Sequence, residues 1–159
     1  MTRAVDVATD RVRVPLARSA VADIVRAVLR AERVPHALVS VTFVSDQRIA
    51  ALNRTHLGRS GATDVIAFGF AQRRAADPVI GDIYIAPGVA RINAASHDVP
   101  MREEIARLVV HGVLHVLGFD HPEGPQRTAS AMWRRQEQLL RRVRAAHDRK
   151  PRKRTAKAA

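Results

Sequence analysis

The spacing of hydrophobic residues along this chain changes between two periods, one typical of strands and one typical of helices. Within residues 38–44 apolar and polar positions alternate, which places three large apolar side chains on one face of a predicted strand: Val39, Val41 and Phe43. Two further strands are predicted over residues 64–70 and 79–85, separated by a polar loop. Residues 4–14 contain shorter β-like pieces. The chain therefore has the pattern for a sheet of about four strands.

Between and after these strands, apolar residues recur every three or four positions, as on one face of a helix. The first such segment starts after Ser19, and its apolar positions are Val21, Ile24, Val25, Val28 and Leu29. Four later segments each start at a residue suited to the cap or first turn of a helix: Ser45, Pro87, Pro100 and Pro125. Gly58 and Gly118 are suited to ending the second and fourth helices. The last helix is predicted to turn five residues inward: Met132, Trp133, Gln136, Leu140 and Val143.

About four strands interleaved with about five helices predict an α+β fold built on a mixed sheet. We predict one domain over residues 1–147, followed by a basic, disordered tail over residues 148–159. The net charge is +12, and residues 134–159 hold most of it, with eleven Lys or Arg against two acidic residues. Clustered Lys and Arg displace counterions from phosphates, so the predicted partner is a polyanion such as RNA. The alternative is that this end of the chain only improves solubility.

Two features of the composition bear on where the protein works. The chain has no cysteine, which excludes disulfides and thiolate metal sites and fits a reducing compartment. Its most apolar stretch, residues 105–119, is too short to span a bilayer and contains two histidines. We therefore predict a cytoplasmic protein with no membrane partner.

Three of the seven histidines fall within one stretch of eleven residues that is otherwise largely apolar. His111 and His115 are four residues apart, so they project from one face of the predicted fourth helix, about one turn apart. Gly118 lets the chain leave this helix and turn back, so that His121 can approach the same point. Three neutral imidazoles are good ligands for zinc and leave a fourth position for water. The pattern predicts one zinc ion on these histidines, at the central long helix.

The alternative for such residues is a set of core histidines, but burying three imidazoles without a shared partner is costly. The His-Glu-x-x-His motif of zinc proteases is absent because position 112 is Gly, so the general base of those enzymes is missing. A glycine inside a helix costs about 1 kcal/mol relative to Ala. Gly112 is therefore typical of a position where another group must approach the helix backbone closely. Asp120 has two interpretations: it orients a ligand histidine, or it stabilises the turn.

Residues 111–121 resemble the His-Gly-x-Leu-His-Leu-x-Gly-Tyr-Asp-His signature of the YbeY family, bacterial endoribonucleases and ribosomal-RNA maturation factors, with Val116 and Phe119 as mild variants. Residues 63–68 are similar to the family's Thr-Asp-Val-Leu-Ser-Phe strand, and residues 81–85 to its Gly-Asp-Ile strand. The pair at residues 52–53, Leu-Asn, also matches. The resemblance covers roughly residues 20–140. It implies an α+β fold, zinc on the three histidines, and single-strand-specific endoribonuclease activity in the maturation of small-subunit ribosomal RNA.

The chain departs from the family pattern at one basic position. Counted back from Thr63, the family's Tyr-Arg pair falls on His56 and Leu57, so the arginine, a phosphate contact by resemblance, is replaced. Arg59 lies two residues later, and we predict that it substitutes as the catalytic basic contact. The alternative is an ordinary, exposed loop arginine. Ala67 also replaces a family serine.

These observations predict a zinc-dependent endoribonuclease whose partners are ribosomal RNA and the ribosomal subunit. An activated water would attack a phosphodiester while positive charge stabilises the phosphate oxygens. The alternative is a non-catalytic ribosome-assembly factor whose metal serves the fold. A fourth protein ligand from Asp or Glu would favour the assembly factor, and an open position for water would favour the enzyme.

Overall fold

A four-stranded mixed sheet forms the framework of the molecule. The structure is a computed structural model, and it describes residues 1–121 and 124–149. The strands are β1 (Thr2–Thr9), β2 (His36–Phe43), β3 (Val65–Phe70) and β4 (Val79–Ile85). Their order in the sheet is β1-β2-β4-β3, with β1, β2 and β4 parallel and β3 antiparallel to β4. The predicted mixed sheet of about four strands is confirmed.

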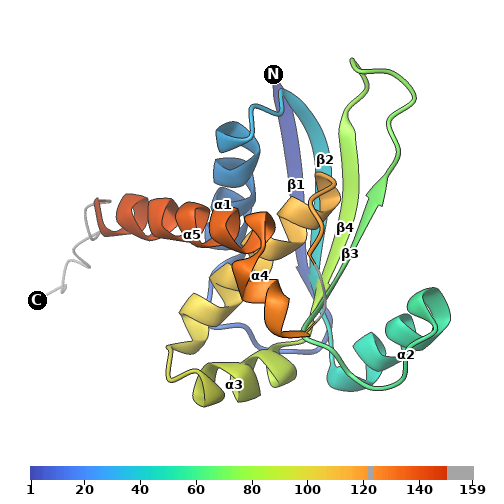
Figure 1. The fold of residues 1–159 in the computed structure, drawn as a ribbon, viewed down its shortest axis with the longest axis vertical. Coiled ribbons are helices and arrows are strands. Elements are labelled where there is room, and N and C mark those ends of the chain that lie inside the picture. Colours follow the sequence, from blue (N-terminus) through green and yellow to red (C-terminus); the bar gives the residue numbers. More distant parts are fainter. Residues whose placement is uncertain (122–123, 150–159) are drawn as a thin grey trace, which may run out of the picture.

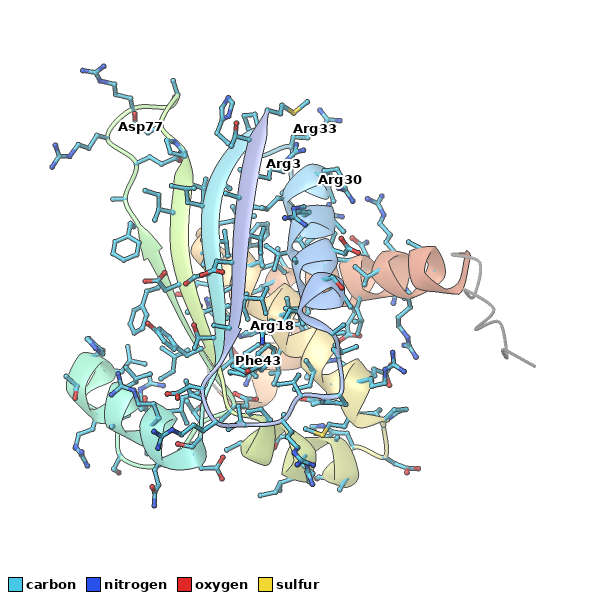
Figure 2. All side chains as sticks on the ribbon, turned by 180° about the vertical axis from the view of Figure 1, so that it is seen from behind. Arg3, Arg18, Arg30, Arg33, Phe43 and Asp77 are labelled. Atoms are coloured by element: carbon cyan, nitrogen blue, oxygen red, sulfur yellow. The ribbon has the colours of Figure 1, made fainter. Side chains whose placement is uncertain are left out.

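The described residues also form five α-helices and one short 3-10 helix. They are α1 (Arg18–Ala31), α2 (Asp46–Leu57), α3 (Pro87–Ser96), α4 (Met101–Val116), η1 (Gly124–Ala129) and α5 (Ala131–Arg149). α1 and α4 lie against one face of the sheet, and α5 packs on both of them (Figure 1). α2 lies at one end of the sheet, and the long loop between β3 and β4, which contains Asp77, extends from the other end (Figure 2). The predicted α+β class is confirmed.

Local signals in the sequence set several helix ends. The Ser45 hydroxyl accepts a hydrogen bond from the Arg48 backbone N–H at 3.1 Å, which caps α2. Gly58 ends that helix in the left-handed conformation, with φ of 63°. Pro87 occupies the first turn of α3, and Gly118 follows α4 with φ of 95°. These predicted boundaries are confirmed.

The predicted start of the last helix at Pro125 is wrong. Pro125 lies in η1, and α5 begins after Ser130. Ser130 is the better cap, because its hydroxyl accepts a hydrogen bond from the Trp133 backbone N–H at 3.2 Å. Among the predicted inward residues, Met132, Gln136 and Leu140 are buried and the other two are half-buried. Leu139 is also buried, which the prediction missed.

The C-terminal end of α5 bears on the predicted domain boundary. The helix continues to Arg149, so it includes the first two residues of the predicted tail. Residues 150–159, the rest of that tail, lie outside the described residues, and their disorder stays a prediction. In the described part of the chain, no helix is both long and apolar enough to cross a membrane.

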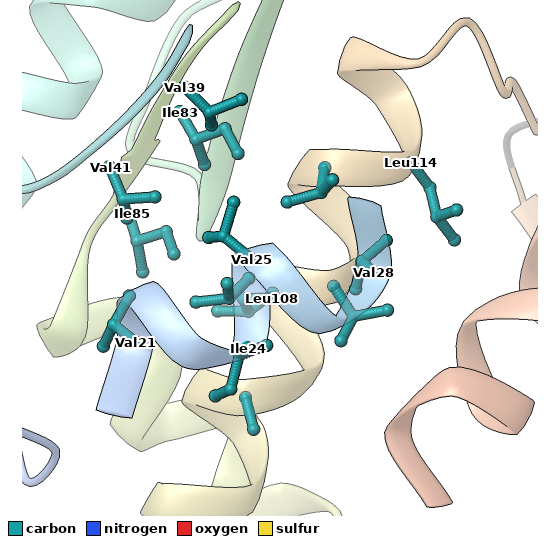
Figure 3. Packing of buried hydrophobic residues seen from close by; sticks show 14 of the residues in the cluster. Val21, Ile24, Val25, Val28, Val39, Val41, Ile83, Ile85, Leu108 and Leu114 are labelled. Carbon is teal, nitrogen blue, oxygen red and sulfur yellow. The ribbon is translucent and has the colours of Figure 1, made fainter. Parts of the chain in front are cut away.

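The main hydrophobic core lies between the sheet and the helices on that face. Figure 3 shows Val21 and Val25 of α1 near the side chains of β2 and β4, with Leu108 of α4 close by. Val21, Val25, Val41, Ile83 and Ile85 are fully buried. Removing such side chains from water contributes about 1.5–3 kcal/mol each, so this core fixes α4 firmly against the sheet.

Three glycines allow the C-terminal half of α4 to sit close to β3 and β4. A Cβ at Gly112 would lie 2.7 Å from Ile83 Cγ2, and a Cβ at Gly81 would overlap the Val116 side chain. A Cβ at Gly69 would lie 2.8 Å from the Val116 carbonyl oxygen. The close approach expected at Gly112 is therefore confirmed, and the partner is β4. This contact places the end of the helix, which carries two of the three histidines, on a rigid support.

Gly69→Ala is expected to lower the free energy of unfolding by about 1–3 kcal/mol, the usual cost of overpacking. The added methyl group meets a backbone carbonyl of α4, so no side-chain rotation can relieve the clash. Urea unfolding followed by circular dichroism measures the effect. Ser60→Ala, in an exposed loop, is the control and should change stability by less than about 0.5 kcal/mol. Equal stability of Gly69→Ala and the parent would contradict this packing.

Candidate metal centre

His111, His115 and His121 converge on one point. Their candidate ligand nitrogens all lie within 4.8 Å of one another. The ring centroids of His111 and His115 are 4.6 Å apart, and each lies 5.1 Å from the His121 ring. The expected convergence of the three rings is confirmed, and the group could hold a metal ion.

The turn after α4 brings His121 back to the helix. The backbone N–H of Gly118 donates to the His115 carbonyl at 2.9 Å, and that of Phe119 donates to the Leu114 carbonyl at 3.0 Å. The Asp120 carboxylate then accepts the His121 backbone N–H at 2.8 Å. Of the two interpretations of Asp120, this contact supports the stabilised turn. The reversal needs the positive φ of Gly118, which costs other residue types more.

His111 is held in one orientation by a residue from another helix. His111 is only 4% exposed, and its Nδ1 lies 2.6 Å from Oε1 of Gln136 on α5, itself 2% exposed. Because an amide oxygen only accepts hydrogen bonds, Nδ1 carries the proton and Nε2 keeps its lone pair for a metal. The Gln136 amide group in turn donates to Glu137 at 3.4 Å, which favours this amide orientation. Gln136 therefore acts on the metal centre through His111.

Burial favours the neutral form of two candidate ligands, His111 and His115. It is the largest cause that lowers the pKa of His111, from 6.5 to about 3, although the hydrogen bond to Gln136 opposes the shift. Burial is also the largest cause that lowers the pKa of His115, followed by the charge of His121. A neutral imidazole at pH 7 does not have to lose a proton before it binds a metal. The site is therefore prepared for a cation at neutral pH.

The donor set fits zinc. Three imidazole nitrogens match the three protein ligands of many catalytic zinc sites. Among the described residues no Asp or Glu joins the three histidines in a ligand group. Residues 122 and 123 lie outside the described residues.

The family assignment follows from comparison with known proteins. A family model described as endoribonuclease YbeY matches residues 5–144. The chain belongs to the YbeY family. Endoribonucleases are hydrolases that act on RNA, so the chain belongs to a family of enzymes with RNA substrates.

Individual YbeY relatives agree with the family model. The chain is 38% identical over 119 residues to endoribonuclease YbeY of Geobacillus kaustophilus, covering 69% of this chain and 75% of the relative. It is 33% identical over 120 residues to endoribonuclease YbeY of Syntrophotalea carbinolica, covering 74% and 80%. A solution structure of a Thermotoga maritima protein matches with a TM-score of 0.61 and 21% identity, covering 92% of this chain and 93% of that one. At that identity the likeness shows the fold alone.

Several residues that match the YbeY pattern hold loops in place. Asn53 is buried, and its amide donates to the Gly61 carbonyl at 3.1 Å. The Asp64 carboxylate accepts hydrogen bonds from the Val65 backbone N–H at 2.8 Å and from the Asn93 amide at 3.1 Å. These contacts tie the segment between α2 and β3 to α3. The matching residues therefore explain the loop conformation.

The segment with the missing family arginine lies at the end of α2. His56 packs edge-on against Phe68 of β3, with ring centroids 5.4 Å apart, and Leu57 is 48% exposed. Arg59 is exposed in the loop toward β3, and its backbone N–H donates to the Asn53 carbonyl at 3.3 Å. The role of Arg59 in RNA cleavage stays a prediction.

Sequence reasoning missed two residues of the metal centre. Gln136 was expected to face inward but was not connected with His111, and Arg127 was not singled out at all. The positive charge of Arg127 contributes, after burial and other causes, to the lowered pKa values of His111 and His115. The one signal for Gln136 was a polar residue on the apolar face of a helix. For Arg127 the sequence offered no signal.

Proposed function

We propose that this YbeY family member is a zinc-dependent, single-strand-specific endoribonuclease that matures small-subunit ribosomal RNA in the cytoplasm. The observation that carries the proposal is the convergence of three imidazoles in a chain of an endoribonuclease family. The concentration of basic residues at the C-terminal end supports a large RNA partner such as the ribosomal subunit.

The roles of the residues follow from their positions. His111, His115 and His121 would hold one zinc ion, with Gln136 fixing the first of them. When bound, zinc supplies Lewis acidity, which acidifies water and stabilises charge on phosphate oxygens. Burial of His111 and His115 keeps the ligand nitrogens neutral and ready for the ion. The turn at Gly118 sets the distance at which His121 completes the group.

A labelled RNA presented in two forms tests the proposed substrate. The zinc-loaded protein is expected to cleave a single strand from a small-subunit ribosomal RNA precursor and to spare the same strand annealed to its complement. Gel electrophoresis of the labelled products gives both rates. Equal cleavage of the two forms would contradict single-strand specificity. Binding without cleavage of either form would instead support the assembly factor.

Arg59→Ala is expected to reduce the rate of RNA cleavage by about 10²–10³, as when one donor to a developing oxyanion is removed. Its zinc content should equal that of the parent, since Arg59 lies in an exposed loop outside the ligand group. Arg54→Ala, an exposed arginine in the last turn of α2, is the matched control and should cleave normally. If Arg59→Ala cleaves like the parent, the assignment of Arg59 is wrong.

A further inference from the structure

Arg127 has a buried donor without an acceptor. Its Nε is the only buried side-chain nitrogen or oxygen without a hydrogen-bond partner in residues 1–121 and 124–149. An unpaired buried donor is destabilising, and more so when the group is charged. Native structures contain few of these groups, and a bound ion or a catalytic role is one explanation for them. A group of this kind therefore points to an acceptor supplied from outside the chain.

The charge of Arg127 acts on the metal centre. The residue lies in η1, six residues after His121, and its carbonyl accepts hydrogen bonds from the hydroxyl of Ser130 at 2.7 Å and from the Ser130 backbone N–H at 3.2 Å. These contacts fix the Arg127 backbone at the start of α5. Burial is the main cause that lowers the pKa values of His111 and His115, and the Arg127 charge adds to both shifts. The guanidinium is thus close enough to act electrostatically on two candidate ligands.

Two other partly buried arginines, Arg107 and Arg135, differ in having carboxylate partners. Arg107 donates to Glu137 at 2.9 Å and also pairs with Glu104, while Arg135 donates to Glu32 at 2.5 Å. No ion pair of Arg127 is found among the described residues. The nearby Asp120 acts on His115, but it is exposed and one of its oxygens accepts the His121 backbone N–H. A metal ion would add further positive charge, so an anion is the ligand that this arrangement lacks.

We propose that the Arg127 guanidinium binds a non-bridging phosphate oxygen of the RNA at the metal centre. The inference rests on the proposed function, because it takes the RNA phosphodiester as the anion. Guanidinium groups bind phosphates through two parallel N–H donors, and the unpaired Nε is one donor of that fork. Arg127 then supplies a second basic contact, in addition to the one predicted for Arg59 near the position where Leu57 replaces the family arginine.

Three variants separate this role from a structural one: Arg127→Gln, Arg127→Lys and a control, Arg30→Gln. Arg30 is exposed at the end of α1 (Figure 2), and its replacement by Gln removes the same charge. For each zinc-loaded protein we would measure the affinity for inorganic phosphate, the affinity for zinc, and the rate of single-stranded RNA cleavage. Circular dichroism and thermal unfolding check that each variant is folded.

Arg127→Gln is expected to weaken phosphate binding about tenfold to a hundredfold, the range for a hydrogen bond to a charged group. RNA cleavage should fall about 10²–10³. Zinc affinity should stay equal or rise, because a cation next to the ion has been removed. Arg127→Lys should recover part of the phosphate affinity, since Lys keeps the charge but lacks the fork. Arg30→Gln should match the parent in all three measurements.

The outcomes distinguish this inference from the proposed function. If Arg127→Gln folds, binds phosphate and cleaves RNA like the parent, the inference is wrong while the endoribonuclease proposal stands. If phosphate binding depends on Arg127 but the zinc-loaded parent cleaves no RNA, the anion contact stands and the proposed activity fails. If Arg127→Gln does not fold, Arg127→Lys decides. An affinity for inorganic phosphate and a rate of RNA cleavage equal to those of the parent would overturn the need for the guanidinium fork.

Discussion

His115→Ala is expected to reduce zinc affinity by at least about a hundredfold and to abolish chelator-sensitive RNA cleavage. Zinc sites with four protein ligands have apparent binding energies of about 10–16 kcal/mol, so each ligand contributes roughly 3 kcal/mol, which is more than a hundredfold. His115 is the best of the three histidines to remove. His115 is only half-buried. His111 is buried and hydrogen-bonded to Gln136, so removing His111 would also leave a buried polar group unpaired.

The zinc content of dialysed protein and the cleavage of labelled single-stranded RNA measure the two effects together. His97→Ala, an exposed histidine at the end of α3, is the matched control and should keep one zinc ion and full activity. Retention of stoichiometric zinc by His115→Ala would show that the ion is held elsewhere. Retention of cleavage without zinc would separate the activity from the three histidines.

Gln136→Leu is expected to weaken zinc binding by about 10–100-fold, the usual effect of removing a residue that orients a metal ligand. Leucine has a similar size but cannot accept the hydrogen bond from Nδ1 of His111. The variant should also lose about 1–3 kcal/mol of stability, because the imidazole N–H is left buried and unpaired. Titration with zinc in the presence of a competing chelator measures the affinity.

Two further variants show whether the effect belongs to this contact. Gln138→Leu changes an exposed residue two positions later on α5, and it should leave zinc affinity unchanged. Gln136→Glu keeps an acceptor oxygen and should retain more zinc affinity than Gln136→Leu. The positioning role is excluded if Gln136→Leu is folded and binds zinc as tightly as the parent does.

The ligand group could be predicted from the sequence because its geometry is local. Helical spacing sets the distance between His111 and His115, and one glycine provides the turn that returns His121. Strand β4 was predicted with its observed bounds for a similar reason, since an apolar run between a polar loop and a proline has few alternatives. In both cases residues within a few positions of one another determine the local structure, so the sequence was sufficient to predict it.

The remainder of the site depends on how distant segments pack. Gln136 meets His111 across twenty-five residues, and this contact exists only because α5 lies across α4. The position from which the Arg127 charge acts on His111 and His115 depends on η1, which forms before Ser130 caps α5, whereas the sequence favoured a helix starting at Pro125. Periodicity predicts which face of a helix is buried, but it does not predict which residue of another element that face meets.

Cleavage of single-stranded RNA by the chelator-treated protein, before and after one equivalent of zinc is added back, tests the central claim most directly. The account predicts no cleavage by the metal-free protein, and recovery that reaches its maximum when one zinc ion is bound per chain. Cleavage by the metal-free protein at the rate of the zinc-loaded protein would contradict the account, as would a fully zinc-loaded protein that leaves the RNA intact.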